Sequence, residues 1–391
     1  MSERAALRAM APFLLAAGAM FAVMYSTQAI LPELGREFDV SPARAGLSIS
    51  AVIAAVALGG WFWGPLSDRI GRRASLVAAS GLIVVPSALV PLAPSFEALL
   101  ALRVLQGLCM PGLLTVGLPY VTEAYSPALG ARAMGYYISS LVAGGLVGRV
   151  GVALATAATS WRVALAGVAL LPLVSTLVMR TRLPEEPDGD RRHEPLARAD
   201  LRRVLGNRRL LAAMAAGAGL FFTFVGTFSY VTFRLEAEPF GLSPAVGGLV
   251  FLLWALGMAG PVAGRVAERV GWQTLALACM GLMAAGLLLS LPEALVPAIA
   301  GAGLVTLANF AGVTAAQLGV AGATAQDRGL ATALYFTAYY VAGGLGGYLP
   351  GLAYEARDWN GVVVLGLAVV GTGAVVVAAS RRASRPPAPA R

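Results

Sequence analysis

Long apolar runs separated by short polar stretches fill this sequence almost from end to end. About twenty consecutive apolar residues cross a bilayer as a helix, so the pattern predicts twelve membrane-spanning helices. Their approximate limits are 9–33, 45–66, 74–93, 97–124, 132–158, 161–180, 208–233, 245–266, 273–292, 294–322, 329–355 and 361–380. One long polar stretch divides the spans six and six. We therefore expect a six-helix bundle over 1–180, a linker over 181–207, and a second six-helix bundle with a short tail over 208–391.

The composition supports a membrane protein. Hydrophobic residues make up 58% of the 391 residues and charged residues only 13%, whereas soluble chains carry about 25% charged residues. The first apolar run, from Met10 to Leu34, is too long for the core of a cleavable signal peptide. The net charge of +9 comes entirely from arginine. These arginines lie at the ends of apolar runs and form no patch, so we expect no nucleic-acid partner.

The distribution of arginine predicts the orientation in the membrane. If the N-terminus is cytoplasmic, 22 of the 29 arginines lie in cytoplasmic segments, five lie outside, and two lie within spans. Cytoplasmic loops of membrane proteins are enriched in positive charge. We therefore expect a multi-pass protein of the cell inner membrane with both termini and the linker in the cytoplasm.

The two halves of the chain repeat each other. "GPLSDRIG" at 64–71 matches "GRVAERVG" at 264–271 with an offset of 200 residues. "VAGGLVGRVG" at 142–151 matches "VAGGLGGYLPG" at 341–351 with an offset of 199. Two bundles related by an axis along the membrane normal are a common transporter architecture. The repeats predict an all-α integral membrane fold of two pseudosymmetric six-helix bundles.

Several of these motifs resemble those of one transporter family. "GPLSDRIGRR" (64–73) is similar to motif A of the major facilitator superfamily, Gly-x-Leu-x-Asp-Arg-x-Gly-Arg-Arg. "ALRVLQG" (101–107) and the glycine-rich fifth span resemble the same superfamily, and "TQAILPEL" (27–34) resembles its drug:proton antiporter branch and the arabinose-efflux-permease-like members. The resemblance implies a monomeric secondary transporter, working by alternating access, that exports drug-like or small organic compounds in exchange for protons. It implies no enzyme activity, cofactor or metal.

The motif A stretch also has a physical interpretation. Gly64 leaves room for a close helix approach, and Gly71 permits a sharp turn. By pseudosymmetry Asp68 should face the first turn of span eleven, and Glu268 that of span five, where free N–H groups attract a carboxylate. We therefore expect a latch that favours the outward-open state, although the arginines alone would also follow the orientation rule. The latch consists of Gly64, Asp68, Arg69, Gly71, Arg72, Glu268 and Arg269.

Two arginines lie inside predicted spans, where a charge is costly unless it is paired or hydrated. Arg103 shares a helix face with Gln106, and the family resemblance implies that it faces the central cavity and takes part in proton transfer. The alternative is a structural arginine that binds backbone carbonyls of span one. Arg149 stands where most drug antiporters have proline. It reaches the cavity and contacts an anionic or polar substrate, or it extends toward the membrane surface.

The proton-carrying residue is less apparent, because no acidic residue lies deep in any span. Glu33, at the outer end of span one, is the first candidate. Glu123, at the inner end of span four, is the second, with a structural helix-end charge as its alternative. His193 lies alone in the linker, and Cys109 and Cys279 lie within apolar runs, so we expect no metal site.

Aromatic and polar residues on the expected cavity-lining spans are the candidates for substrate contact. A cavity with several rings and few charges suits amphipathic organic molecules, although aromatic stripes also serve packing or face lipid. The intramembrane arginines, with no acid near them, leave a carrier for uptake or exchange of a small organic anion as the alternative function. The candidate substrate-binding residues are Tyr25, Gln28, Arg103, Arg149, Phe224, Phe228, Asn309 and Tyr339.

Overall fold

A computed structural model describes residues 3–123, 127–184, 198–324 and 327–383, and no strand occurs in these ranges. The helical elements of the first half are α1 (Glu3–Tyr25), η1 (Gln28–Ile30), α2 (Leu31–Phe38), α3 (Pro42–Ile70), α4 (Arg72–Leu89), η2 (Val90–Leu92), α5 (Phe96–Cys109), α6 (Pro111–Glu123), α7 (Pro127–Leu146), η3 (Val147–Gly151), α8 (Val152–Ala158) and α9 (Trp161–Arg182). Those of the second half are α10 (Arg198–Leu205), α11 (Arg208–Glu236), α12 (Pro244–Gly248), η4 (Leu249–Ala259), α13 (Gly260–Val270), α14 (Trp272–Leu289), α15 (Leu295–Ala321) and α16 (Arg328–Ala383).

These helices account for the predicted membrane spans. Within the described ranges, ten helical segments are long and apolar enough to cross a membrane, and α12–η4–α13 forms one further, bent span. The last segment, Arg328–Arg382, has 55 residues, and a helix of that length would measure about 80 Å against a hydrocarbon core of about 30 Å. It breaks at Arg357 and Asp358, where the backbone leaves helical geometry. α16 therefore contains spans eleven and twelve, and the all-α membrane fold is confirmed.

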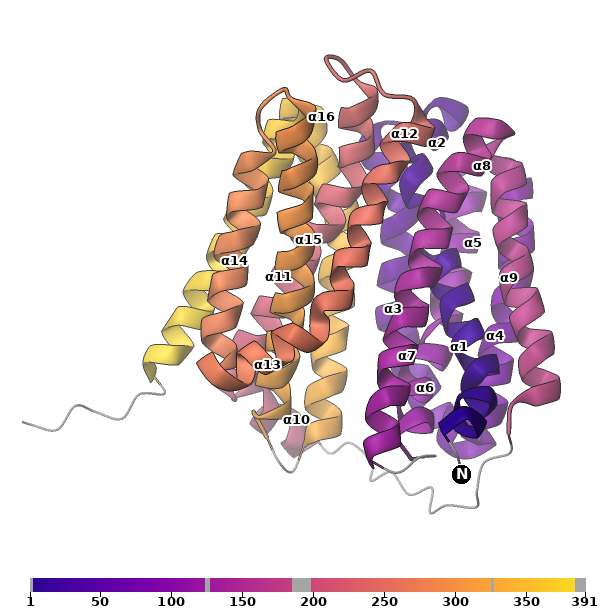
Figure 1. Ribbon diagram of the computed structural model, residues 1–391, viewed down its shortest axis with the longest axis vertical. Helices are drawn as coiled ribbons and strands as arrows, with labels where there is room; N and C mark the ends of the chain where they lie inside the picture. The colour runs from indigo at the N-terminus through magenta and orange to yellow at the C-terminus, as the bar shows by residue number, and fades with distance from the viewer. Residues whose placement is uncertain (1–2, 124–126, 185–197, 325–326, 384–391) are drawn as a thin grey trace, which may run out of the picture.

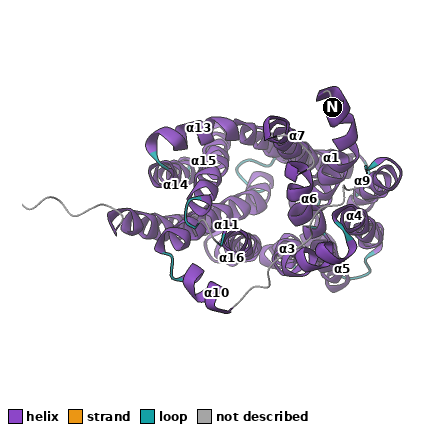
Figure 2. Ribbon diagram, turned by 90° about the horizontal axis from the view of Figure 1, so that it is seen from below, coloured by secondary structure: helices purple, strands orange, loops and turns teal. Residues whose placement is uncertain are grey.

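The helices gather into two groups that stand side by side (Figure 1). α1 to α9 form one group and α11 to α16 form the other, and the view along the helices shows the same separation (Figure 2). We call them the N-bundle and the C-bundle. The N-terminus and α10 lie at the lower end in Figure 1, which we call the linker end. α2 and α12 lie at the opposite end, which we call the far end.

Specific residues mark the ends of several of these helices. At the far end, the hydroxyls of Ser41, Ser95 and Ser160 accept hydrogen bonds from the first turns of α3, α5 and α9, as N-cap residues do. At the linker end, Gly71 and Gly271 adopt positive φ angles of 90° and 83° between consecutive helices. Only glycine adopts such angles without strain. The two turns correspond to each other in the repeat, and the turn expected at Gly71 is confirmed.

The bundles meet along two helix pairs. α3 packs along the first half of α16, while η3 and α8 of the N-bundle pack against η4 and α12 of the C-bundle. A Cβ atom on Gly344 would lie 3.0 Å from the Cβ of Ala54, so small residues let these two helices approach closely. Near the far end, a Cβ atom on Gly46 would collide with the backbone oxygen of Gly347. Small residues therefore bring α3 and α16 into close contact at both of these levels.

Candidate functional site

Arg149 lies at the centre of the bundle interface and is fully buried. Its Nε donates to Oε1 of Gln28 at 2.7 Å, and its Nη1 donates to the backbone oxygen of Gly145 at 2.9 Å. Arg149 belongs to η3, a π-helical turn inserted between α7 and α8. Such turns often mark functional sites. The sequence predicted two alternatives for Arg149, and the structure places it inside the protein.

Two aromatic rings from different bundles enclose the Arg149 guanidinium. Its Cζ lies 3.7 Å from the ring centroid of Tyr25 in the N-bundle and 3.4 Å from that of Trp254 in the C-bundle. A cation over an aromatic face is attracted by the ring, and the attraction grows when water is excluded. The charge of Arg149 is therefore held between the two bundles, with no carboxylate among the partners described.

Further rings of the C-bundle surround Trp254. The Trp254 centroid lies 4.7 Å from that of Phe224, 6.1 Å from Phe228 and 5.8 Å from Phe310. The Phe251 centroid lies 5.7 Å from that of Phe228, with the two rings tilted by 39°, and 5.6 Å from Cζ of Arg149. Tyr25, Trp254, Phe224, Phe228, Phe251 and Phe310, together with Arg149, form what we call the aromatic cluster.

Several polar atoms in and around the cluster are buried and have no hydrogen-bond partner. Nη2 of Arg149 and Nε1 of Trp254 belong to the cluster itself, whereas Oδ1 of Asn309 and Oγ1 of Thr227 belong to residues that directly precede Phe310 and Phe228 in the chain. An unsatisfied buried polar atom costs about 1–3 kcal/mol, and more when the group is charged. Each of these atoms can form a hydrogen bond with a ligand that supplies the missing partner. The combination of rings with unused donors and acceptors suits an organic molecule that carries at least one strongly accepting group.

The structure brings together most of the substrate-contact candidates but separates Arg103 from them. Arg103 is fully buried inside the N-bundle, and its guanidinium donates to the backbone oxygens of Ser48 and Val23, both at 2.9 Å, and to that of Met24. It also donates to Oε1 of Gln106 at 2.7 Å. Val23 and Met24 lie in the last turn of α1, where carbonyls lack helical partners. Arg103 thus binds the carbonyls at the end of α1, as the structural alternative expects, and its role as a substrate contact stays a prediction.

Tyr339 lies in a second group of rings nearer the linker end. Its ring stacks on Phe221 with centroids 3.9 Å apart and planes 7° apart. Tyr335 and Tyr340 of the same helix lie 5.9 and 5.4 Å from Tyr339. Among the described residues, the ring contacts of Tyr339 are with Phe221, Tyr335, Phe336 and Tyr340 rather than with the rings around Arg149.

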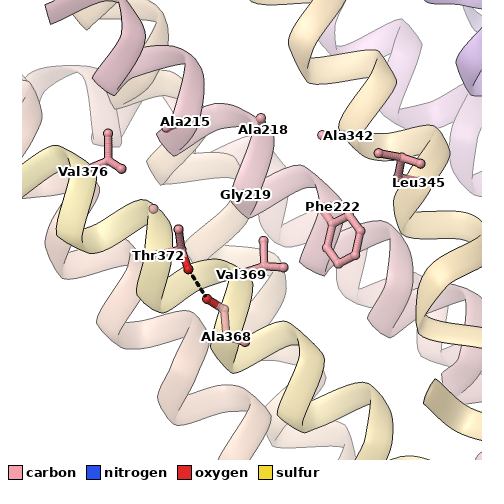
Figure 3. A pocket seen from close by; sticks show the side chains of 11 residues that line it. Ala215, Ala218, Gly219, Phe222, Ala342, Leu345, Ala368, Val369, Thr372 and Val376 are labelled. Carbon is pink, nitrogen blue, oxygen red and sulfur yellow. Dashed lines mark hydrogen bonds between the residues drawn. The ribbon is translucent and has the colours of Figure 1, made fainter. Parts of the chain in front are cut away.

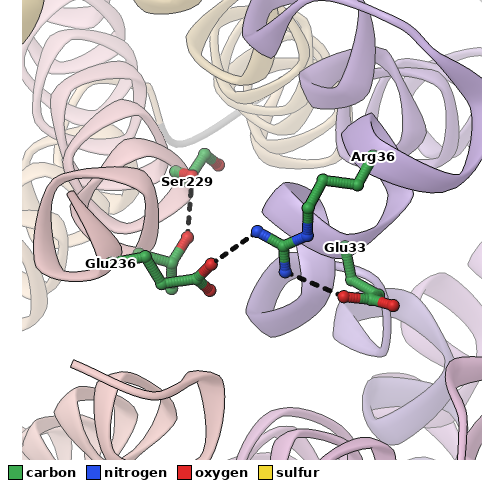
Figure 4. Close-up of polar contacts among 5 residues, drawn as sticks. Glu33, Arg36, Ser229 and Glu236 are labelled. Carbon is green, nitrogen blue, oxygen red and sulfur yellow. Dashed lines mark hydrogen bonds and ion pairs between the residues drawn. The ribbon is translucent and has the colours of Figure 1, made fainter. Parts of the chain in front are cut away.

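Charged residues join the bundles at the far end. Arg36 of α2 donates to Glu33 at 2.8 Å and, across the interface, to Glu236 at the end of α11 at 2.9 Å (Figure 4). The carboxylate of Glu355, on α16, accepts a 2.8 Å hydrogen bond from the backbone N–H of Ala43 in the first turn of α3. We call these two inter-bundle contacts, Arg36–Glu236 and Ala43–Glu355, the far-end clasp.

The far-end clasp should stabilise the conformation described here. The test is the double variant in which glutamine replaces both Glu236 and Glu355. We expect each lost contact to raise the population of molecules with a separated far end by about two- to fivefold, because an exposed ion pair or a charge at a helix N-terminus contributes about 0.3–1 kcal/mol. Spin labels on cysteines at Leu92 and Glu293, which end spans three and nine, would measure the separation. The matched control is Glu97→Gln, which removes an ion pair with Arg44 inside the N-bundle. An equal shift in the control would contradict the clasp.

Comparison with known proteins now places this architecture. A family model described as Major Facilitator Superfamily matches residues 13–325 and again residues 235–391. The chain belongs to the major facilitator superfamily. It is accordingly a multi-pass membrane transporter of small molecules and not an enzyme.

Relatives and solved structures agree with this assignment. The chain is 34% identical to the inner membrane transport protein YnfM of Escherichia coli over 88% of this chain and 83% of YnfM. It is 28% identical to the multidrug resistance protein MdtM of Escherichia coli over 42% of this chain and 41% of MdtM. The crystal structure of a bacterial homolog to the human lysosomal transporter Spinster, inward-facing and occupied, aligns with a TM-score of 0.79 and 16% identity over 97% of this chain and 98% of that one.

The motif A residues of this superfamily member lie at the linker end. Asp68 is half-buried, whereas Arg69, Glu268 and Arg269 are exposed. A Cβ atom on Gly64 would meet nothing within 4 Å, so the close helix approach expected there is absent from this conformation. The latch is a prediction for the outward-open state and stays one. The side chains of Glu123 and of the residues just before span five lie outside the described part of the chain.

A groove of about 380 Å³ lies on the C-bundle, away from the aromatic cluster (Figure 3). It runs between α11 and the two halves of α16, and Phe222, Leu345 and Val376 are among its lining residues. Leu345 and Val376 are exposed on spanning helices, so this groove faces the lipid of the bilayer. Its lining is almost entirely apolar, and it offers none of the unpaired polar atoms that mark the aromatic cluster.

Proposed function

We propose that this transporter exports small amphipathic organic compounds in exchange for protons, and that the aromatic cluster binds them. The observation that carries the proposal is Arg149, whose buried Nη2 lacks a partner between the rings of Tyr25 and Trp254. The rings would hold the apolar body of a compound, and Arg149 would bind its accepting or anionic group. Partial similarity to a multidrug resistance protein supports this kind of substrate.

The proposed mechanism is alternating access by the two bundles, taken as 1–180 and 208–391 and joined by the 181–207 linker. Tyr25, Arg149 and Trp254 are almost completely shielded from solvent, so a substrate reaches them only when the bundles separate at one end. With the arginine-rich linker end in the cytoplasm, the far-end clasp would close the outer side. The conformation described here would then be closed outward, and separation of the bundles at the linker end would expose the aromatic cluster to the cytoplasm.

Proton coupling makes a separate prediction about two carboxylates. Glu33 shares Arg36 with Glu236, so protonating Glu33 would change the charge balance at the far end. We expect Glu33→Gln to abolish the dependence of transport on an imposed pH gradient, with Glu123→Gln as the second variant to examine. The measurement is initial flux in proteoliposomes with and without the gradient. If both variants remain gradient-driven, the proton is carried elsewhere or transport is not coupled to protons.

The latch predicts a different effect at the linker end. Asp68→Asn removes the charge that should bind the first turn of span eleven in the outward-open state, a loss of about 1–2 kcal/mol for a partly buried charge at a helix N-terminus. We expect about a tenfold lower transport rate from protein that still inserts and folds. Flux per folded molecule, normalised by size-exclusion chromatography, provides the measurement. Transport at the wild-type rate would remove the latch from the mechanism.

The proposed function is tested by transport against a panel of compounds in proteoliposomes. An exporter of the proposed kind moves amphipathic compounds, and the pH gradient drives them. The second candidate, a carrier for a small organic anion, is favoured by the unneutralised charge of Arg149. It predicts transport confined to anions that proceeds by exchange without a pH gradient. Failure of every organic compound in the panel would reject both.

A further inference from the structure

The amide of Gln28 joins Arg149 to the opposite bundle. Gln28 is completely buried in η1, directly after the end of α1. Its Oε1 accepts from Nε of Arg149 at 2.7 Å, while its Nε2 donates to Oγ of Ser229 at 3.2 Å. Arg149 and Gln28 belong to the N-bundle, and Ser229 belongs to α11 of the C-bundle. The Gln28 side chain therefore connects Arg149 to α11 of the C-bundle.

One edge of the Arg149 guanidinium, formed by Nε and Nη2, uses only one of its two nitrogens for a hydrogen bond. A planar guanidinium binds a carboxylate in a bidentate manner through two parallel N–H groups, and Nε and Nη2 form one such edge. On this edge Nη2 has no partner, and Nε is occupied by Gln28. A carboxylate that binds both nitrogens would fill the empty position and displace the Gln28 oxygen in the same step.

We propose that Gln28 is a positioning residue that couples occupancy of Arg149 to closure of the bundle interface. While Gln28 is anchored by Arg149, its amide nitrogen holds Ser229 and stabilises the closed interface. When an anionic group of a substrate takes Nε and Nη2, Gln28 loses its anchor and the bond to Ser229 is lost. The bundles then separate more readily with substrate bound than without it. A ligand shifts a conformational equilibrium only through such a difference in its interactions with the two states.

The inference rests on the proposed function only in treating Arg149 as the group that a substrate approaches. The location of the Gln28–Ser229 hydrogen bond fits the proposed coupling. Ser229 directly follows Phe228 in α11, and this helix ends at Glu236, which pairs with Arg36 at the far end. The Gln28–Ser229 bond is thus placed between the aromatic cluster and the far-end clasp. A change at Arg149 can therefore reach the far-end clasp through Gln28, Ser229 and the end of α11.

The test uses no substrate and no pH gradient, so its failure is distinguishable from failure of the proposed function. Spin labels are placed on cysteines at Leu92 and Glu293 in the full chain, with Cys109 and Cys279 replaced by alanine. Distance distributions are then compared for Gln28→Met, Ser229→Ala, the double variant and Arg149→Met. The matched control is Thr223→Ala, which removes a buried hydroxyl of α11 that bonds only within its own helix.

We expect Gln28→Met and Ser229→Ala each to raise the share of molecules with a separated far end by about two- to tenfold, as for loss of one hydrogen bond. The double variant should match either single variant, because both remove the same bond. Arg149→Met should shift the distribution in the same direction. The proposal is overturned if Ser229→Ala behaves like Thr223→Ala, if the two single effects multiply in the double variant, or if Arg149→Met leaves the distribution unchanged. Should Gln28→Met fail to fold, the comparison of Ser229→Ala with Arg149→Met still decides.

Discussion

Arg149→Lys is expected to lower transport at least tenfold while the protein remains folded. The planar guanidinium stacks between two rings 3.7 and 3.4 Å away and keeps a free nitrogen for a ligand. An ammonium group is a point charge that neither stacks in this way nor binds a carboxylate through two parallel N–H groups. Loss of one charge-assisted hydrogen bond costs about 1.5–3 kcal/mol, which corresponds to a ten- to hundredfold change. Initial flux per folded molecule is the measurement.

The chain offers a matched control for this substitution. Arg162 also places its guanidinium over an indole, with Cζ 4.2 Å from the Trp161 centroid, but it lies half-buried at the far end and pairs with Glu37. Arg162→Lys should therefore leave transport close to the wild-type rate. If Arg149→Lys transports every compound as well as the wild type does, Arg149 has only a structural role, and the anion-carrier alternative loses much of its support.

Arg103→Met is expected to have the opposite profile and to lower the stability of the folded protein strongly. Arg103 donates to carbonyls at the end of α1 and to the backbone of Ser48 in α3. Each buried acceptor that loses its partner costs about 1–3 kcal/mol, and Arg103→Met removes the donor from several of them at once. We expect a clear drop in the thermal unfolding temperature of the purified protein, measured by tryptophan fluorescence.

Arg149→Met provides the comparison for this second prediction. Because Arg149 donates two hydrogen bonds and leaves one nitrogen unsatisfied, whereas Arg103 donates four, replacing Arg149 with an apolar side chain of similar length should cost less stability than Arg103→Met. Equal unfolding temperatures for the two variants would contradict the division of roles, in which Arg103 holds α1 in place and Arg149 serves the substrate.

The sequence was sufficient to predict the architecture because membrane spans and turns leave local signals. Apolar run length located the spans, including the two that α16 joins across Arg357 and Asp358. The repeated motif identified equivalent positions, and Gly71 and Gly271 indeed share one backbone conformation. These features depend on a few neighbouring residues in the chain, so they can be predicted without knowledge of the tertiary contacts.

The composition of the candidate site was harder to predict, because every face of a spanning helix is apolar whether it meets lipid or another helix. Periodicity therefore did not distinguish Trp254, Phe251 and Phe310 from lipid-facing residues, although the structure places Trp254 and Phe251 beside Arg149 and Phe310 beside Trp254. One signal was available: the indole N–H of Trp254 lies in the middle of an apolar span, where it needs a partner. The cross-bundle bond from Gln28 to Ser229 depends on tertiary contact alone.

The most direct test of the central claim is the binding preference of the purified protein for a carboxylate over its neutral analogue. The panel's best-transported carboxylate and its primary carboxamide would be compared by calorimetry in the wild type and in Arg149→Gln. Our account predicts at least tenfold tighter binding of the carboxylate by the wild type and nearly equal binding by the variant. Equal binding of both compounds by the wild type, or a preference that survives without Arg149, would contradict it.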